Sequence, residues 1–240
     1  MGVFFCDIFF AMENQQIQVK KLPAMPDVFR RINANVGLFQ LVTKGRFNSV
    51  LDIGSGAGEH AKIFEAYGKT VTRFDFGKSR AFDAKTQSGK TIIGDYLHYD
   101  FEQSFDCVWA SHVLEHTVYT HEFLVKIRRD CKPKGLIAIT VPPAKSEFVG
   151  GHVTLWTPAL LLYRMVLAGI DCRKASVFRY GYNITVITGN RANNVVLEEL
   201  AWDFHDIERL QKFFPADIHA QMNGDLAGDV YQGAQVNLVK

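Results

Sequence analysis

Three closely spaced glycines and two acidic residues are the first sign of chemistry in this sequence. Gly54, Gly56 and Gly58 follow the apolar segment 49–53, which contains Asp52. Glycines placed directly after a strand let the backbone turn sharply and approach a ligand, beside the N-terminus of the next helix. Asp75 ends the next apolar segment, where a carboxylate in a doubly wound sheet accepts hydrogen bonds from ribose hydroxyls. The pattern predicts a site for a ligand that carries a nucleoside.

The elements that position these residues alternate between strands and helices. Five apolar segments predict strands: 49–53, 70–75, 91–93, 105–110 and 136–141. A helical stretch that ends before Gly68 separates the first two predicted strands. A second helical stretch, 119–131, separates the last two. Because strands separated by helices form parallel sheets that are covered on both faces, we expect an α/β, doubly wound fold.

The pattern changes after the fifth predicted strand. Residues 159–168 predict a helix, and the β-rich segments 172–179 and 183–188 are joined by so short a link that we expect an antiparallel hairpin. The tail contains one further helical candidate, residues 195–213.

In this order, the motifs resemble those of class I S-adenosylmethionine-dependent methyltransferases, in particular types 11 and 23. The dinucleotide fingerprint would need glycine at position 59, where this chain has Glu59. The resemblance covers residues 47–190 and includes the final hairpin, which distinguishes this sheet from that of nucleotide-dependent dehydrogenases. It implies a Rossmann-like sheet, mostly parallel with a C-terminal antiparallel hairpin strand, and S-adenosylmethionine as the cofactor.

The resemblance also implies which residues bind the cofactor. The glycine-rich segment wraps the methionine part, Asp75 holds the ribose, and Asp95 points toward the exocyclic amine of the adenine. The implied set is Asp52, Gly54, Ser55, Gly56, Gly58, Asp75, Phe76, Asp95, Tyr96, Ala110 and Ser111. For Asp95 a second interpretation stays open, because aspartate is also an ordinary turn former. Asp106 lies at the start of its predicted strand, far from the ligand edge, and is predicted to be structural.

Three histidines are the candidate catalytic residues. Methyl transfer needs the lone pair of the acceptor aligned with the methyl carbon, and a hydroxyl acceptor also benefits from a base with a pKa near 7. His112 and His116 follow the fourth strand at a spacing that one helical face can carry. In related methyltransferases a histidine in the loop after the fifth strand often faces the acceptor, so His152 is the best candidate for a base or orienting residue. Metal ligation by the two histidines and Glu115 is the alternative, but no partner motif accompanies them, and no metal is expected.

Two other functions remain open beside methyl transfer to a small-molecule or glycan-type acceptor at oxygen or nitrogen. One is an NAD(P)-dependent oxidoreductase, which Glu59 and the hairpin disfavour, and the other is a non-catalytic protein that binds S-adenosylmethionine. The Asn/Asp-Pro-Pro-aromatic motif of enzymes that methylate amino groups of DNA bases is missing after the fourth strand, where Ala110-Ser111-His112 stands. The net charge of +2 also disfavours a nucleic-acid partner.

Composition and cysteine usage point to an ordinary globular protein of the cytoplasm. The chain has 240 residues, 48% hydrophobic and 22% charged, which is close to the globular average. Its four cysteines are widely spaced, which favours reduced, buried thiols. The apolar segment 1–12 lacks a basic flank and contains Asp7, so no integral membrane association is expected. We expect a cytoplasmic monomer or homodimer.

The organisation follows from where the motifs lie. Residues 1–46 are predicted as an N-terminal extension, 47–190 as the cofactor-binding domain, and 191–240 as a C-terminal extension packed on it. Segment 1–12 is interpreted as an anchoring strand or as a leader that precedes a native start at Met12. The acidic tail residues around Asp206 and the basic residues of 126–134 are both interpreted as solvated faces.

Overall fold

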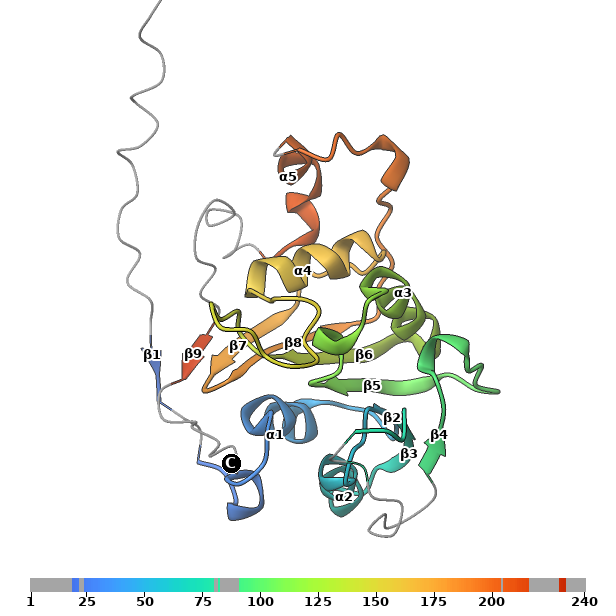
Figure 1. Cartoon of the computed structure of the whole chain (residues 1–240), viewed down its shortest axis with the longest axis vertical. Helices are drawn as coiled ribbons and strands as arrows, with labels where there is room; N and C mark the ends of the chain where they lie inside the picture. Colours follow the sequence, from blue (N-terminus) through green and yellow to red (C-terminus); the bar gives the residue numbers. More distant parts are fainter. Residues whose placement is uncertain are drawn as a thin grey trace, which may run out of the picture.

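The computed structural model describes residues 19–21, 24–79, 82, 91–203, 205–215 and 229–231. The interpretation of segment 1–12 lies outside these residues. The described part of the chain forms one sheet of nine strands flanked by helices (Figure 1).

The sheet has the strand order β1-β9-β7-β8-β6-β5-β2-β3-β4 within the described residues. Its strands are β1 Val19–Lys20, β2 Ser49–Ile53, β3 Thr70–Asp75, β4 Thr91–Ile93, β5 Phe105–Ser111, β6 Cys131–Val141, β7 Ser176–Tyr180, β8 Asn183–Gly189 and β9 Asp229–Tyr231. Neighbouring strands from β4 to β6 run parallel, and β8 is antiparallel to both β6 and β7. The predicted Rossmann-like sheet with an antiparallel hairpin is therefore confirmed. Beyond the hairpin, β9 and β1 extend the edge.

Helices cover both faces of this sheet (Figure 1). They are α1 Asn35–Lys44, α2 Glu59–Ala66, α3 Thr120–Asp130, α4 Pro158–Leu167 and α5 His205–Leu210. Because side chains alternate along a strand, β5 contributes to two cores. Cys107 and Trp109 pack in the core on the α1 and α2 side, whereas Val108 and Ala110 pack in the core on the α3 and α4 side.

The predicted helix 195–213 is wrong. That stretch contains the short 3-10 helices η4 Leu197–Glu199 and η5 Gln211–Phe213, with α5 between them. The side chain of Asp206 accepts hydrogen bonds from the backbone N–H groups of Ala201 and Trp202, at 3.0 and 2.7 Å. Aspartate thus satisfies a turn in place of a helix, and Asp206 is buried rather than part of a solvated face.

The start of β6 also differs from the prediction. The strand begins at Cys131, directly after α3, whereas the sequence predicts its start at 136. Lys134 has a positive φ of 65°, and the β5–β6 register shifts between Phe105 and Cys107. The side-chain amide of Asn190, the residue after β8, donates to the carbonyls of Cys131 and Lys132, so these hydrogen bonds hold the irregular start of β6. Similarly, β7 starts at Ser176 rather than at 172.

Two charged residues near the start of β6 have structural roles. Lys126 is buried, and its Nζ lies 2.8 Å from Asp130 Oδ2 and 4.7 Å from the centre of the Tyr96 ring, so the interpretation of a fully solvated basic face is wrong for this residue. Asp106 accepts hydrogen bonds from the N–H groups of Asn48 and Ser49 and pairs with Lys132. Asp106 therefore ties the start of β5 to the start of β2, which agrees with the predicted structural role.

The three cysteines in the described residues, Cys107, Cys131 and Cys172, are free and buried, in agreement with the expected reduced thiols. Among the described helices, none combines the length and the apolar character that crossing a membrane requires.

Candidate functional site

A cavity of about 660 Å³ lies at the carboxyl ends of β2, β3, β4 and β5. Ligands of open α/β sheets bind at this edge, and the volume is within the usual range for small-molecule sites. Among the residues predicted from the sequence, the cavity is lined by Gly54, Ser55, Gly56, Asp75, Phe76, Asp95, Tyr96, Ser111, His112 and His116. Asp52, Gly58, Ala110 and His152 are not part of this lining.

The glycine loop after β2 forms one wall of the cavity. Gly54 has a φ of 70° and Gly56 a φ of 51°, in the left-handed region that side chains other than glycine rarely occupy. A Cβ on Gly54 would lie 2.3 Å from Cγ2 of Val113. The N–H of Gly54 donates to the carbonyl of Phe74 at 2.8 Å. The loop is therefore fixed against β3 and packed too closely against the segment after β5 to hold a side chain.

Asp75 connects this loop to the end of β3. Its Oδ2 accepts a hydrogen bond from the Gly56 N–H at 2.9 Å, and its Oδ1 accepts one from the Gly77 N–H at 2.7 Å. Each carboxylate oxygen has capacity for a further hydrogen bond. A buried carboxylate that lines the cavity and retains acceptor capacity fits the predicted contact with two ribose hydroxyls.

The segment after β4 forms the opposite wall. Asp95 Oδ1 accepts from the N–H of Leu97, and Asp95 Oδ2 lies 3.0 Å from His98 Nδ1. Both oxygens of Asp95 thus serve the local turn, which supports the second interpretation of this residue, and its contact with adenine stays a prediction. The hydroxyl of Tyr96 donates to Asp130 at 2.8 Å, so this hydroxyl is directed into the core. Phe76, which is exposed, also lines the cavity.

Asp52 lies beneath the glycine loop rather than in the cavity lining. Its side chain is 1% exposed, and Oδ2 has no hydrogen-bond partner among the described residues. Burial raises the pKa of Asp52 to about 7, against the opposing charge of Arg73 and with a further contribution from Asp75. A role for Asp52 in cofactor binding stays a prediction.

This buried carboxyl gives an expected pH dependence of stability. The raised pKa means that, between about pH 4 and pH 7, the unfolded chain loses the proton of Asp52 while the folded chain keeps it. The free energy of unfolding therefore falls as the pH rises through this window and levels off above it. We expect Asp52→Asn to remove much of this fall, so that the variant gains stability over the wild type at pH 8 and less at pH 4. Urea denaturation at pH 4 and pH 8 measures the free energy of unfolding of both proteins. If the variant and the wild type differed by the same amount at both pH values, the raised pKa of Asp52 would be contradicted.

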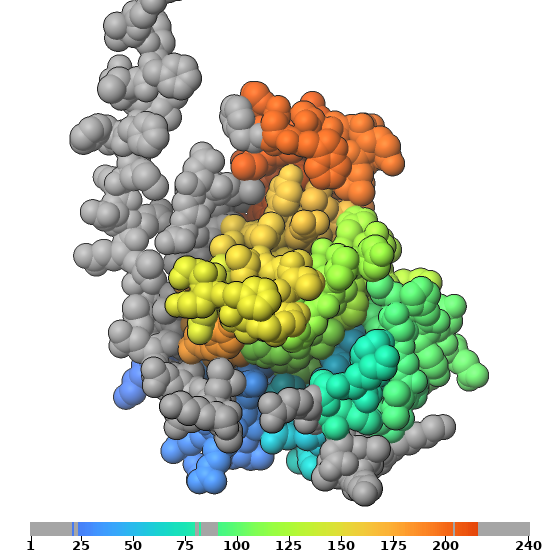
Figure 2. All heavy atoms as spheres, viewed as in Figure 1, coloured from blue at the N-terminus to red at the C-terminus, as the bar shows by residue number. Residues whose placement is uncertain are grey.

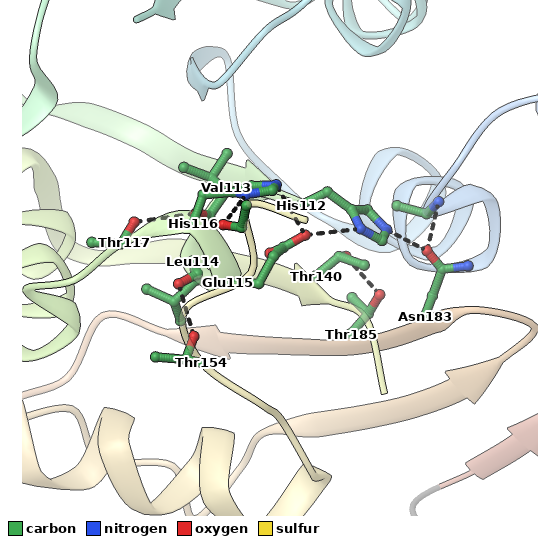
Figure 3. A network of polar contacts seen from close by, with 12 residues as sticks. His112, Val113, Leu114, Glu115, His116, Thr117, Thr140, Thr154, Asn183 and Thr185 are labelled. Carbon is green, nitrogen blue, oxygen red and sulfur yellow. Dashed lines mark hydrogen bonds and ion pairs between the residues drawn. The ribbon is translucent and has the colours of Figure 1, made fainter. Parts of the chain in front are cut away.

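His112 is held by hydrogen bonds at both ring nitrogens (Figure 3). Nδ1 lies 3.2 Å from Glu115 Oε1, and Nε2 lies 2.9 Å from Asn183 Oδ1, which also accepts from the Ala34 N–H. Both partners are acceptors, so both nitrogens of His112 donate and the ring is an imidazolium. Burial disfavours this charge, but the hydrogen bond and the charge of Glu115 outweigh it and raise the pKa of His112 above its ordinary value. In this arrangement His112 has no lone pair with which to accept a proton.

His116 and His152 lie together on the other side of Glu115. Their ring centres are 5.0 Å apart at nearly perpendicular planes. His116 Nδ1 lies 2.8 Å from the carbonyl of Gly151, in the loop after β6 that carries His152. In Figure 2 this loop, in yellow, is visible beside the green segment that follows β5. The structure therefore brings the two histidines together across the 36 positions that separate them in the sequence, as both follow neighbouring parallel strands.

Sequence reasoning missed His60 and Asn33 as parts of the cavity wall. The indole N–H of Trp109 donates to His60 Nδ1 at 3.1 Å, so His60 carries its proton on Nε2 and donates it to the carbonyl of Asn33 at 3.0 Å. Burial lowers the pKa of His60 to about 4, with the carbonyl of Asn33 opposing the shift. The position of His60, directly after the glycine segment, is the signal that could have indicated it.

Two hydroxyls in the lining indicate that the cavity is built for a polar ligand. Ser55 Oγ and Ser111 Oγ are both buried, and neither has a partner among the described residues. Buried polar groups are normally hydrogen-bonded, so a ligand that supplies partners would satisfy them. With the glycine loop and Asp75, these hydroxyls fit the amino acid and ribose portions of S-adenosylmethionine.

The described chain has the fold of S-adenosylmethionine-dependent methyltransferases of known structure. Residues 51–139 match the family model described as methyltransferase domain, and S-adenosylmethionine is the cofactor of this class of enzyme. The matched segment runs from β2 to β6 and includes the glycine loop, Asp75 and the segment after β5.

Relatives of known identity are methyltransferases. A curated relative, (S)-coclaurine N-methyltransferase of Papaver somniferum, is 26% identical over 141 residues, which is 48% of this chain and 40% of the relative. The match thus spans less than half of the length of that enzyme.

Solved structures share the fold. A methyltransferase of Archaeoglobus fulgidus superposes with a TM-score of 0.52 at 18% identity, over 63% of this chain and 89% of the other. The 1,6-didemethyltoxoflavin-N1-methyltransferase of Burkholderia thailandensis, bound to S-adenosylhomocysteine, superposes with a TM-score of 0.52 at 18% identity, over 65% and 76%.

Proposed function

We propose that this protein transfers the methyl group of S-adenosylmethionine to nitrogen or oxygen of a small-molecule acceptor. The proposal depends on one observation: a single cavity is lined both by the predicted cofactor-binding residues and by residues that follow β5. The same cavity is lined by Asp75 and the glycine loop at its cofactor side and by His112, His116 and Tyr119 after β5. A space lined in this way has a wall for the cofactor and a wall for a second molecule.

In methyl transfer the main role of the protein is to align the cofactor with the acceptor. The glycine loop and Asp75 would hold S-adenosylmethionine, which would supply a methyl group on a positively charged sulfur. The lone pair of the acceptor would form the new bond, the electron pair of the broken carbon–sulfur bond would stay on sulfur, and any proton of the acceptor would pass to solvent. Alignment of the two reactants then provides most of the rate. The imidazolium of His112, fixed by Glu115 and Asn183, is suited to holding a wall of the cavity rather than to accepting the proton of the acceptor.

The features near the cavity favour a small acceptor with an apolar part. Val118 and Tyr119 line the cavity and are 70% and 62% exposed. The near-neutral net charge of +2 disfavours a nucleic acid. The curated relative is by its name an N-methyltransferase, which supports nitrogen as the methylated atom. A glycan-type acceptor is the second possibility within the same reaction.

Calorimetric titration with S-adenosylhomocysteine and with NAD tests the cofactor. We expect micromolar binding of S-adenosylhomocysteine and none of NAD; NAD binding without S-adenosylhomocysteine binding would overturn the proposal in favour of an oxidoreductase. Transfer of tritium from methyl-labelled S-adenosylmethionine into the small-molecule, polysaccharide and nucleic-acid fractions of a lysate tests the acceptor. We expect label in the small-molecule fraction. No transfer to any fraction, with S-adenosylhomocysteine still bound, would support a non-catalytic cofactor-binding protein.

His152 is proposed to act on the acceptor rather than on the cofactor. Its loop lies beside His116 but outside the lining of the cavity. We expect His152→Ala to leave the affinity for S-adenosylhomocysteine unchanged and to lower kcat by roughly 10- to 100-fold, because the acceptor loses an orienting group. His205→Ala, which changes an exposed histidine at the start of α5, is the control. If His152→Ala bound S-adenosylhomocysteine more weakly than the wild type, His152 would contribute to cofactor binding, and its proposed role at the acceptor would be wrong.

We further propose that residues 24–46 and 191–215 belong to the same domain as 47–190, since Leu38, Leu210 and Phe214 pack in the two cores of the sheet. The protein is proposed to act in the cytoplasm as a monomer or homodimer.

A further inference from the structure

We propose that Glu115, His116 and His152 form a binding site for a divalent transition-metal cation, with Zn²⁺ as its representative. One ligand atom of each side chain lies within 4.8 Å of the ligand atoms of the other two. The set of two imidazoles and one carboxylate is the ligand set of many mononuclear zinc and iron sites. The methyltransferase fold does not require such a site, and its existence is independent of the proposed acceptor.

His116 is oriented as a metal-binding histidine. Its Nδ1 is 2.8 Å from the carbonyl oxygen of Gly151, and because a carbonyl only accepts, Nδ1 carries the proton. The lone pair is therefore on Nε2, which lies 3.9 Å from Glu115 Oε1. Histidine ligands typically donate their second N–H to a backbone carbonyl in this way, which fixes the tautomer and the direction of the ring.

Glu115 supplies the observation that points to a ligand. Its side chain is 1% exposed, and Oε1 is bonded to His112 (Figure 3). Oε2 is also buried and has no hydrogen-bond partner among the described residues. An unpaired buried carboxylate oxygen costs free energy, and the single contact with His112 leaves half of the carboxylate unsatisfied. A cation beside Glu115 would satisfy it.

The loop after β6 is fixed in the position that the site needs. The N–H of Val153 donates to the backbone carbonyl of Glu115 at 2.8 Å, so the neighbouring His152 is held close to Glu115. No residue of the described chain forms a side-chain hydrogen bond with His152, and its imidazole is available as a ligand. Gly151 has a φ of 83°, and a Cβ there would lie 3.2 Å from His116 Nδ1. Glycine at 151 therefore permits the close approach of the two segments.

The geometry favours a late first-row cation over Mg²⁺. Imidazole suits Zn²⁺ and its neighbours, whereas Mg²⁺ prefers oxygen ligands. Metal–nitrogen bonds are about 2.0–2.1 Å long, so the rings of His116 and His152, neither of which is buried, must turn inward when the ion binds. Three protein ligands leave a fourth position for water or another donor. Since His116 also lines the cofactor cavity, an oxygen or nitrogen atom of an acceptor could occupy that position.

Calorimetric titration of chelator-treated protein (residues 1–240) with ZnCl₂, in the absence of cofactor, tests the proposal. We expect one Zn²⁺ per chain with micromolar or tighter affinity. His152→Ala and His116→Ala should each weaken binding by at least about tenfold, whereas His205→Ala, which also removes one histidine, should bind like the wild type. His152 and His116 are not buried, so both variants are expected to fold, and circular dichroism checks this.

Cobalt identifies the ligands directly. The Co²⁺-loaded protein should show d–d absorption without a sulfur-to-cobalt charge-transfer band, because thiolates are not part of the proposed set. Absence of stoichiometric Zn²⁺ binding, equal binding by the folded His152→Ala variant, or a thiolate band would each overturn the site. Titration of the same sample with S-adenosylhomocysteine keeps the two proposals separate, since failure of one does not affect the measurement of the other.

Discussion

Replacement of Asp75 by alanine is expected to weaken binding of S-adenosylhomocysteine by about 100-fold, the equivalent of two charge-assisted hydrogen bonds at roughly 1.5 kcal/mol each. Two losses combine in this variant. The ribose hydroxyls lose their proposed acceptor, and the N–H groups of Gly56 and Gly77 lose the carboxylate that holds the loop. Calorimetric titration measures the change.

Asp100→Ala is the matched control for this prediction. Asp100 carries a carboxylate that is 86% exposed and pairs with Arg129 on the surface, so its removal should leave cofactor affinity unchanged. Thermal unfolding monitors whether the Asp75 variant is folded. Wild-type affinity in a folded Asp75→Ala protein would mean that the ribose is bound elsewhere.

Replacement of Gly54 by alanine should weaken cofactor binding by at least about 100-fold. A left-handed conformation costs a residue with a Cβ about 1–2 kcal/mol. In addition, the new methyl group would overlap Val113, whose Cγ2 lies 2.3 Å from its position. The loop or the segment after β5 must move, and both line the cavity.

Gly68→Ala distinguishes the effect of backbone strain from the effect of overlap with Val113. Gly68 has a φ of 74°, similar to that of Gly54, but a Cβ there meets nothing within 4 Å. We expect both single variants to lose stability through backbone strain, and only Gly54→Ala to lose cofactor affinity. The double variant Gly54→Ala/Val113→Ala removes the overlapping methyl and should recover part of the affinity. Equal cofactor affinity of the two single variants would show that the contact with Val113 is irrelevant.

The sheet could be predicted because its signals are local. Apolar segments such as 49–53 and 105–110 are bounded by glycine or polar residues, and the short link between the hairpin strands allows only an antiparallel return. The glycine loop and Asp75 were predictable for the same reason, since their spacing follows from one strand–turn–helix unit. These residues line the cavity, and their contact with the cofactor stays a prediction.

The remaining parts depend on contacts between distant segments. A solvated charge and a buried one look alike in a sequence, and Lys126 is buried only because Asp130 and the ring of Tyr96 compensate its charge. His112 could be predicted as a cavity residue, but its two donor contacts depend on Asn183, 71 positions away. The proximity of His152 to Glu115 depends on a backbone hydrogen bond between two loops, for which the sequence carries no pattern.

The hydrogen bonds from Trp109 through His60 to Asn33 have a consequence for acid tolerance. They join the centre of the sheet to a residue that precedes α1 and forms part of the cavity wall. Protonation of His60 would turn Nδ1 into a donor facing the donor of Trp109, and the chain of contacts would break. Since the pKa of His60 is lowered to about 4 from 6.5, the unfolded chain takes up this proton first, and stability declines as the pH falls between these values. The imidazolium would keep its donation to the carbonyl of Asn33 and lose only the contact with Trp109, so that acid exposure is expected to detach this part of the cavity wall from β5.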